Sequence, residues 1–389
     1  MKKPTLILIC LFVVSLAKAQ ERTITTAVPF LLVAADARAA GMADQGVATS
    51  VDAFSQQWNP AKYAFSEDKQ GFSVSYTPYL TDLVNDVSLG QITYYNKIND
   101  RNAFAASFRY FGFGDIELRR TGEQEEIPVV VSPNELALDG SYSLKLSEKF
   151  SMAVAGRYIR SNLKIATEDV DAKPASSFAV DVAGFYQSEE IAYNSFNGRW
   201  RGGFNIQNLG PKMKYDSDEL NANFLPANLK VGGGFDFILD DYNKLAVGVE
   251  FSKLLVPTPQ DPDLDGDGTV TLQERMQNNE DYRSIGWVSG IFQSFGDAPG
   301  GFSEELKEIT YSIGAEYMYQ DAFAFRLGYF HESPEKGARK FFSLGAGFKY
   351  NVVKVDVSYL FSTSNVKNPL ENTLRFSLTF NFGDKYEVY

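Results

Sequence analysis

Apolar and polar residues alternate in short segments along most of this chain, from about residue 71 to residue 383. The last segment shows the pattern most clearly. One of its faces carries Leu374, Phe376, Leu378, Phe380 and Phe382, and the other carries Arg375, Ser377, Thr379 and Asn381. A period of two residues is typical of a β-strand with one apolar and one polar face. About fourteen such segments occur, an even number, as expected for a bacterial transmembrane barrel.

The polar faces of these segments contain many glycines and some charged residues. Similar alternation occurs over residues 178–186, 229–239, 245–251, 311–319 and 353–361. Gly232, Asp236 and Glu250 are examples from two neighbouring segments. Small and charged residues on the face opposite an apolar one indicate a crowded or hydrated barrel interior.

The links between the segments alternate in length. Short turns are predicted near residues 99–100, 147–149, 240–243, 320–321 and 351. Longer links are predicted at 81–85, 114–133, 164–175, 210–226, 254–308, 332–339 and 363–372. Outer-membrane barrels have short periplasmic turns and long outer loops, whereas a secreted β-sandwich has no reason to sort its loops by side. We therefore predict an all-β fold, a transmembrane antiparallel β-barrel over residues 67–389, with both termini in the periplasm.

The preceding segment, residues 20–66, does not alternate and is rich in Ala, Gly and Ser between residues 30 and 63. Asp36 is expected to cap a short helix, and Ser50 a second helix that places Phe54 and Trp58 on one face. Pro60 should end that second helix. Small residues allow close backbone packing, so the preferred interpretation is a plug that enters the barrel lumen from the periplasmic end. The alternative is a pair of surface helices in front of the barrel.

The first 19 residues have the features of an export signal. Lys2 and Lys3 precede an apolar run over residues 6–16, and small residues at 17–19 form a cleavage site. The run is too short to span a bilayer as a helix. It contains Cys10, the single cysteine, so a mature chain starting near Gln20 would have no disulfide, thiolate metal site or thiol nucleophile.

Charge and composition narrow the class of partner. The whole chain has 37 basic and 49 acidic residues, and loss of three signal lysines leaves 34 against 49, a net charge of −15. This balance argues against nucleic acid as a partner. Aromatic residues make up 14% of the chain, as suits a barrel in contact with outer-membrane lipid.

The sequence offers little for enzyme chemistry. The single histidine, His331, ends a predicted strand beside Glu332, with no serine or cysteine motif near it. No glycine-rich phosphate loop or His-rich metal motif is present in the sequence. We therefore predict that the protein is not an enzyme.

One motif in the 254–308 loop is specific. Residues 263–274 match a twelve-residue calcium loop, with candidate ligands at Asp263, Asp265, Asp267, Thr269, Thr271 and Glu274. Gly268 stands at position six, where the loop turns sharply. The preceding residues include Pro257 and Pro259, which exclude the usual entering helix. The alternatives are a Ca²⁺ site and a solvated acidic loop.

The same loop contains apolar residues at helical spacing between residues 284 and 295. They are Trp287, Ile291, Phe292 and Phe295. This segment either covers the barrel or docks another protein, since exposed apolar patches usually mark contacts.

Three short N-terminal motifs resemble a known family. They are Ala37-Arg38-Ala39-Ala40-Gly41-Met42-Ala43-Asp44, then Gly46-Val47-Ala48, and Asn59-Pro60-Ala61. They resemble the N-terminal region of the long-chain fatty acid transporter superfamily. Residues 27–65 together resemble more closely the PorV family, outer-membrane proteins of the Bacteroidetes type IX secretion system. Gln45 departs from the small residue expected at its position. The resemblance makes Arg38, Gly41, Met42, Gly46, Asn59 and Pro60 the plug motif.

The resemblance implies a fourteen-stranded barrel that does not transport fatty acid. Such a protein accepts secreted cargo, through the cargo's C-terminal signal domain, as it leaves the outer-membrane translocon. It then carries the cargo to an attachment complex that contains the sortase PorU. The resemblance assigns no cargo-binding residues. The alternative is a channel for long-chain fatty acids or other hydrophobic small molecules.

Overall fold

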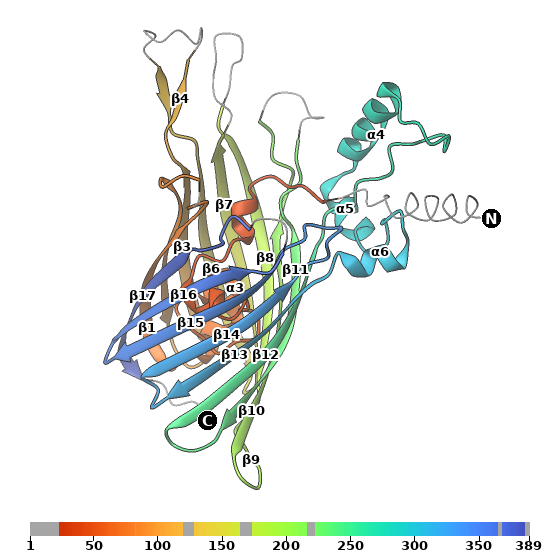
Figure 1. Cartoon of the computed structure of the whole chain (residues 1–389). Helices are drawn as coiled ribbons and strands as arrows, with labels where there is room; N and C mark the ends of the chain where they lie inside the picture. The colour runs from red at the N-terminus through yellow and green to blue at the C-terminus, as the bar shows by residue number, and fades with distance from the viewer. Residues whose placement is uncertain are drawn as a thin grey trace, which may run out of the picture.

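The protein is a closed antiparallel barrel of 14 strands (Figure 1). The computed structural model describes residues 23–81, 83–119, 128–163, 173–215, 222–364 and 368–385. Neighbouring strands pair in chain order, and β17 pairs with β1 to complete the ring. The predicted strand number is confirmed, whereas the predicted signal peptide, residues 1–19, lies outside the described residues.

The barrel strands are β1 (Asp68–Pro78), β2 (Val87–Lys97), β3 (Asn102–Phe113), β6 (Asn134–Ser147), β7 (Phe150–Asn162), β8 (Ala175–Gln187), β10 (Asn197–Leu209), β11 (Asn228–Ile238), β12 (Asn243–Leu254), β13 (Thr310–Tyr319), β14 (Phe323–His331), β15 (Lys340–Tyr350), β16 (Val353–Ser362) and β17 (Leu374–Lys385). Three further strands lie in connections: β4 (Ile116–Leu118), β5 (Val129–Val131) and β9 (Ile191–Ala192).

Alternation along each strand separates the lumen from the outer wall. In β1, Ser73 and Ser75 point inward and are buried, while Phe72, Val74 and Tyr76 point outward and are exposed. Exposed apolar side chains with this periodicity form the lipid-facing band of a membrane barrel.

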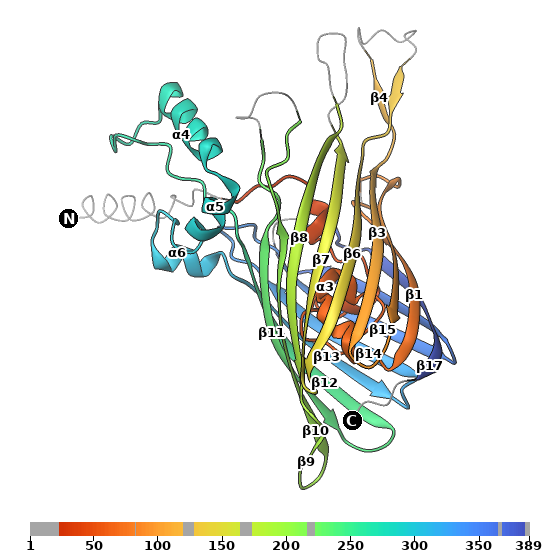
Figure 2. The same ribbon diagram turned by 180° about the vertical axis from the view of Figure 1, so that it is seen from behind.

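The two ends of the barrel have connections of different length, as predicted. One end carries tight turns, such as the one between β13 and β14, where Gln320 and Asp321 both have positive φ, as hairpin turns require. The other end carries the β4–β5 hairpin and the loop of residues 255–309, with helices α4 (Leu272–Ser284), α5 (Trp287–Gln293) and α6 (Phe302–Lys307) (Figures 1 and 2). Among the described residues, no helix has both the length and the apolarity needed to cross a membrane.

The N-terminal segment fills the lumen with four short helices, which confirms the predicted plug. They are η1 (Pro29–Leu32), α2 (Ala37–Ala40), α3 (Ser55–Trp58) and η2 (Pro60–Phe65). The Asp36 side chain caps α2 by accepting a hydrogen bond from the Ala39 amide at 2.8 Å. The predicted cap at Ser50 is wrong: α3 begins only at Ser55 and has no side-chain cap. Ser50 instead accepts hydrogen bonds from the Arg38 guanidinium.

The plug runs through the lumen in the direction opposite to the prediction. The Ala27 amide donates to the Phe224 carbonyl in the β10–β11 connection, at the long-loop end. At the other end of the plug, Phe65 packs against Phe185 near the short turns, just before β1 begins. The described chain therefore starts at the long-loop end, while β17 ends at the short-turn end beside the start of β1. Entry from the short-turn end is not observed, and the periplasmic location of both termini stays a prediction.

Candidate functional site

Arg38 of the plug binds one wall of the barrel through buried charges. Its Nε and Nη2 atoms donate to the two carboxylate oxygens of Glu316 on β13, at 3.0 and 2.8 Å. Its Nη1 atom donates to Asp52 at 2.8 Å. Arg326 on β14 also donates to Glu316, at 2.6 Å. Because all four side chains are largely withdrawn from water, this network holds the plug in one position.

Glycines allow the plug backbone to approach the barrel wall. A Cβ on Gly41 would lie 2.9 Å from the Cα of Gly345, and one on Gly328 would lie 2.4 Å from the Ala43 amide nitrogen. Within the plug, a Cβ on Gly46 would lie 2.1 Å from the Trp58 ring. The inward-facing glycines of the strands thus serve backbone-to-backbone packing, which leaves little room between plug and wall.

The other plug-motif residues also lie in this contact. The Asn59 amide donates to the carbonyls of Val47 and Gly184, at 2.8 and 3.0 Å, and Pro60 opens η2. Met42 packs close to Gly314 on β13. The structure therefore brings the whole plug motif into the lumen.

Sequence analysis missed the wall residues that hold the plug. Glu250 on β12 accepts hydrogen bonds from the Gly46 and Val47 amides, at 2.8 and 2.9 Å. The unexpected Gln45 donates to the carbonyls of Gly248 and Ser312. Charged residues at inward positions in mid-strand were the available signal, because such positions need a partner inside the barrel.

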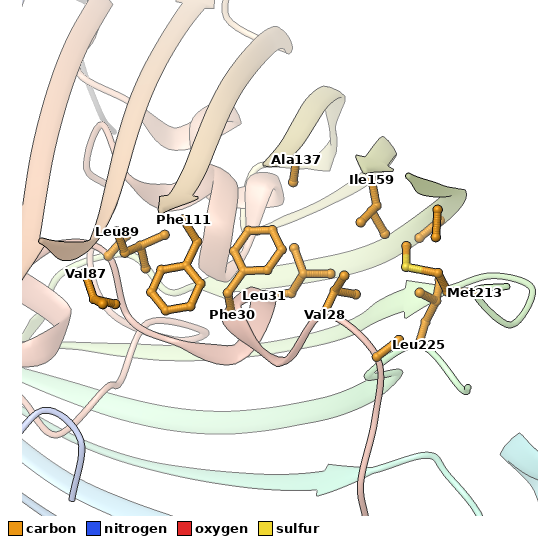
Figure 3. Packing of buried hydrophobic residues seen from close by; sticks show 14 residues of the cluster. Val28, Phe30, Leu31, Val87, Leu89, Phe111, Ala137, Ile159, Met213 and Leu225 are labelled. Carbon is orange, nitrogen blue, oxygen red and sulfur yellow. The ribbon is translucent and has the colours of Figure 1, made fainter. Parts of the chain in front are cut away.

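The lumen is closed at the long-loop end by an apolar cluster (Figure 3). Val28, Phe30 and Leu31 of the plug pack among wall residues that include Leu89, Phe111, Ile159 and Met213. Phe30 stacks on Phe111 with ring centroids 6.1 Å apart. Below this cluster, the cavity between Arg38, Gln45 and strands β10–β13 has a volume of about 20 Å³, the space of a single water molecule. Plug and wall are thus in close contact on this side of the lumen.

The loop of residues 255–309 is attached firmly to the barrel rim. Lys253, at the end of β12, forms ion pairs with Glu305 and Glu308 at 3.0 and 2.6 Å. Lys336, from the β14–β15 connection, pairs with Glu308 at 2.9 Å. These partly dehydrated pairs fix α6 between the end of β12 and the β14–β15 connection.

The predicted docking segment is not one helix. Ser284 ends α4 and α5 starts at Trp287, so Phe295 lies beyond the end of α5. Trp287 and Ile291 are half-buried, whereas Phe292 and Phe295 are exposed. Three further exposed apolar residues, Val288, Phe302 and Leu306, were not predicted. With Phe292 and Phe295 they form what we call the α5–α6 surface: Val288, Phe292, Phe295, Phe302 and Leu306. Figures 1 and 2 both show α5 and α6 side by side at the flank of the long-loop end.

The candidate calcium loop folds so that its acidic residues converge. Carboxylate oxygens of Asp263, Asp265 and Asp267 lie within 4.8 Å of one another. Gly268 has a φ of +85°, which permits the turn at position six. As predicted, residues 255–262, which precede the motif, form no helix. Oxygen donors in this number and arrangement suit a hard divalent cation such as Ca²⁺.

The second half of the motif also serves as a helix start. The Thr271 hydroxyl accepts from the Glu274 amide, and Glu274 accepts from the Thr271 amide, a capping box for α4. The other Glu274 oxygen accepts from the Leu264 amide at 3.2 Å, which keeps this carboxylate beside the loop. Hydrogen bonds from Thr271 lower the pKa of Glu274, so the group is ionised at neutral pH. Thr269 lies in the loop, where its amide donates to Asp267 at 2.6 Å.

His331 packs against two tyrosines. Its ring stacks on Tyr311 with centroids 4.8 Å apart, and its Nδ1 atom lies 3.3 Å from the Tyr329 hydroxyl. This arrangement is aromatic packing and not the pairing of a base with a nucleophile.

Comparison with known proteins gives both a family and a fold. The sequence model of the family described as "Type IX secretion system protein PorV" matches residues 16–261, more than half of the chain. No curated protein matches the sequence.

Among solved structures, the TodX deltaS2S3 mutant monoaromatic hydrocarbon channel is 11% identical, with a TM-score of 0.51 over 89% of this chain and 98% of that one. The Pseudomonas putida toluene transporter TodX is 10% identical, with a TM-score of 0.47 over 88% and 95%. A Pseudomonas aeruginosa FadL homologue is 12% identical, with a TM-score of 0.44 over 90% and 99%. At these identities the similarity concerns the fold alone.

Proposed function

The chain belongs to the PorV family of the type IX secretion system, and on this premise we propose that it is a non-enzymatic carrier of secreted proteins in the outer membrane. It would bind cargo through the cargo's C-terminal signal domain at the translocon. It would then deliver the cargo to an attachment complex containing the sortase PorU. Following the rule for barrels of this kind, its long-loop end would face the cell exterior.

The observation that carries this proposal is a filled lumen next to an exposed apolar surface. The plug occupies the barrel from the apolar cluster at the long-loop end to η2 at the short-turn end. The α5–α6 surface, in contrast, exposes five apolar side chains on or next to α5 and α6, and ion pairs fix α6 to the rim. Apolar side chains that are held rigidly in solvent favour protein contact over passage of a solute.

The second candidate is a channel for long-chain fatty acids or other hydrophobic small molecules. The fold shared with hydrocarbon channels is compatible with it. A channel, however, needs the plug to move, because Phe30 and Leu31 occupy the apolar mouth where a hydrophobic solute would enter.

Replacing Phe292 and Phe302 with Asp should prevent cargo binding without affecting the barrel. Both rings are more than 70% exposed, so their loss leaves no cavity, while two charges on the α5–α6 surface oppose burial in an interface. We expect at least a tenfold loss of cargo recovered with the tagged protein from outer membranes, measured by quantitative mass spectrometry. Leu83→Asp, at another exposed apolar position, is the matched control and should recover cargo normally. Equal recovery with both variants would exclude the α5–α6 surface as the cargo site.

We also propose that the 263–274 loop binds Ca²⁺ and so orders the segment next to α5. Asp263, Asp265, Asp267 and Glu274 would supply carboxylate oxygens, and Thr269 its carbonyl. Loops of this type outside the cell work at affinities of about 10⁻⁴–10⁻³ M, so weak binding would suffice.

Removing the acidic residues should therefore imitate the removal of calcium. The variant Asp263→Asn with Asp265→Asn should show the same protease cleavage within residues 254–308 as wild-type protein treated with a chelator. Asp321→Asn, an exposed carboxylate in a short turn, is the control and should respond to the chelator as wild type does. The calcium proposal fails if the chelator leaves wild-type cleavage unchanged and calorimetry detects no binding at millimolar Ca²⁺.

A further inference from the structure

An apolar groove with a volume of about 710 Å³ lies on the outer wall of the barrel, over strands β10–β13. Its lining includes Trp200, Phe235, Gly233, Val249 and Ile313. The groove lies outside the plugged lumen and is separate from the α5–α6 surface, so neither part of the proposed function uses it.

The floor of the groove contains the outward-facing Gly233, and a second outward-facing glycine, Gly202, lies beside it. Gly202 on β10 is paired with Gly233 on β11, and a Cβ on either would meet no atom closer than 3.8 Å. The neighbouring Gly232 faces inward, where a Cβ would lie 2.7 Å from a Val47 methyl group of the plug. Because alternate residues of a strand face opposite sides, Gly233 must face the membrane. The missing side chain at Gly233 therefore deepens the groove, and Gly202 beside it adds no side chain that would fill it.

An aromatic cluster forms the wall of the groove nearest the short turns. The Phe235 ring lies 4.6 Å from Trp200 and 6.0 Å from Tyr193, by ring centroids. Phe235 is only 8% exposed although it shares the outward face with Gly233. Gly198 makes this packing possible, since a Cβ there would lie 2.2 Å from Phe235. The wall is thus held in place by protein contacts and does not depend on a ligand.

The position of the groove identifies its occupant. Val231, Val249 and Ile313 around it are exposed and continue the lipid-facing band of the barrel. Exposed tyrosines at the short-turn end of the same strands, Tyr242 and Tyr319, suit the interface between the lipid and water. The groove therefore opens to hydrocarbon, and its aromatic end lies toward a headgroup region.

We propose that the groove binds one acyl chain of a phospholipid from the membrane leaflet at the short-turn end. Transfer of a chain from bilayer to groove gains nothing from the hydrophobic effect, because both environments are apolar. Binding arises from dispersion contacts with walls that are already ordered, which costs the protein little conformational entropy.

Gly233→Leu tests the proposal by filling the floor of the groove. The full-length protein in detergent is titrated with phosphatidylethanolamine that is brominated along one acyl chain. Bromine quenches tryptophan fluorescence, and the contribution of Trp200 is the difference between the wild-type protein and a Trp200→Phe variant. Loss of about ten carbon contacts should raise the half-saturating lipid concentration about tenfold. Gly140→Leu, at an outward glycine with no atom within 4 Å of its Cβ position, should match wild type.

Two results would overturn the proposal. One is quenching that rises without saturation and is equal in all three proteins, which indicates bulk lipid only. The other is capture of a protein, and not of lipid, by a photo-crosslinking residue at Val249 in intact outer membranes. Heat-dependent gel mobility shows whether each variant is a folded barrel, and Gly202→Leu replaces Gly233→Leu if the latter does not fold.

Discussion

Replacing Arg38 with Ala is expected to lower the free energy of unfolding of the barrel by about 3–5 kcal/mol. The substitution leaves Asp52 in the lumen without its guanidinium partner and leaves Glu316 with Arg326 alone. Removing one partner of a buried ion pair costs this much because the remaining charge stays dehydrated. Urea titration in detergent, followed by gel mobility, measures the change.

The control for Arg38 is a cation at the surface. Lys244 pairs with Asp321 in a short turn, where both side chains are well exposed. Lys244→Ala should change the free energy of unfolding by less than about 1 kcal/mol. Similar values for Lys244→Ala and Arg38→Ala would contradict the assignment of Arg38 as the residue that fixes the plug to the wall.

Gly46→Leu is expected to have a comparable effect through packing alone. The new side chain would overlap the Trp58 ring, whose indole nitrogen donates to Asp36 at 2.7 Å. Moving Trp58 would break that hydrogen bond and displace the cap of α2. Overpacking of this kind costs about 3 kcal/mol, so much less folded barrel should accumulate in the outer membrane.

Gly140→Leu separates the packing effect from the general effect of a larger residue. Gly140 faces the membrane and has no neighbour near its Cβ position, so this variant should accumulate as wild type does. If Gly46→Leu also accumulates normally, the plug has room to move and the lumen is not tightly filled.

The barrel itself could be predicted from the sequence because the features that indicate it, alternation and link length, are local. Alternation such as that from Phe72 to Tyr76 in β1 reports which side of the wall each residue faces. The lengths of the links then show which strand ends lie on the same side of the barrel. The link at Gln320 and Asp321, for example, is a tight turn in the structure, where both residues have positive φ angles. The plug was predictable as a region because its small residues suit neither a lipid-facing strand nor an exposed tail.

The path of the plug could not be predicted, because it depends on contacts between distant residues. Entry from the long-loop end rests on the Ala27–Phe224 hydrogen bond and on Phe30 stacking against Phe111. Neither contact has a local signature in the sequence. Ser50 is a second example. Serine often caps helices, but in the folded protein the Ser50 hydroxyl accepts a hydrogen bond from Arg38 instead.

The candidate site was predictable only in part for a related reason. Alternation shows that Glu316 and Arg326 point inward, but not which plug residue they meet. In the 255–309 loop, spacing located Phe292 and Phe295 but not Phe302, because the position of α6 depends on rim ion pairs such as Lys253–Glu305.

We have proposed that this barrel serves protein secretion and does not conduct hydrophobic solutes. The most direct test deletes the gene and measures, in the same cells, the release of secreted cargo and the uptake of a radiolabelled long-chain fatty acid. We expect that cargo stays unreleased and unprocessed while fatty acid uptake is unchanged, and that the wild-type gene restores release. Normal release of cargo together with impaired uptake would contradict it and would identify the protein as a channel.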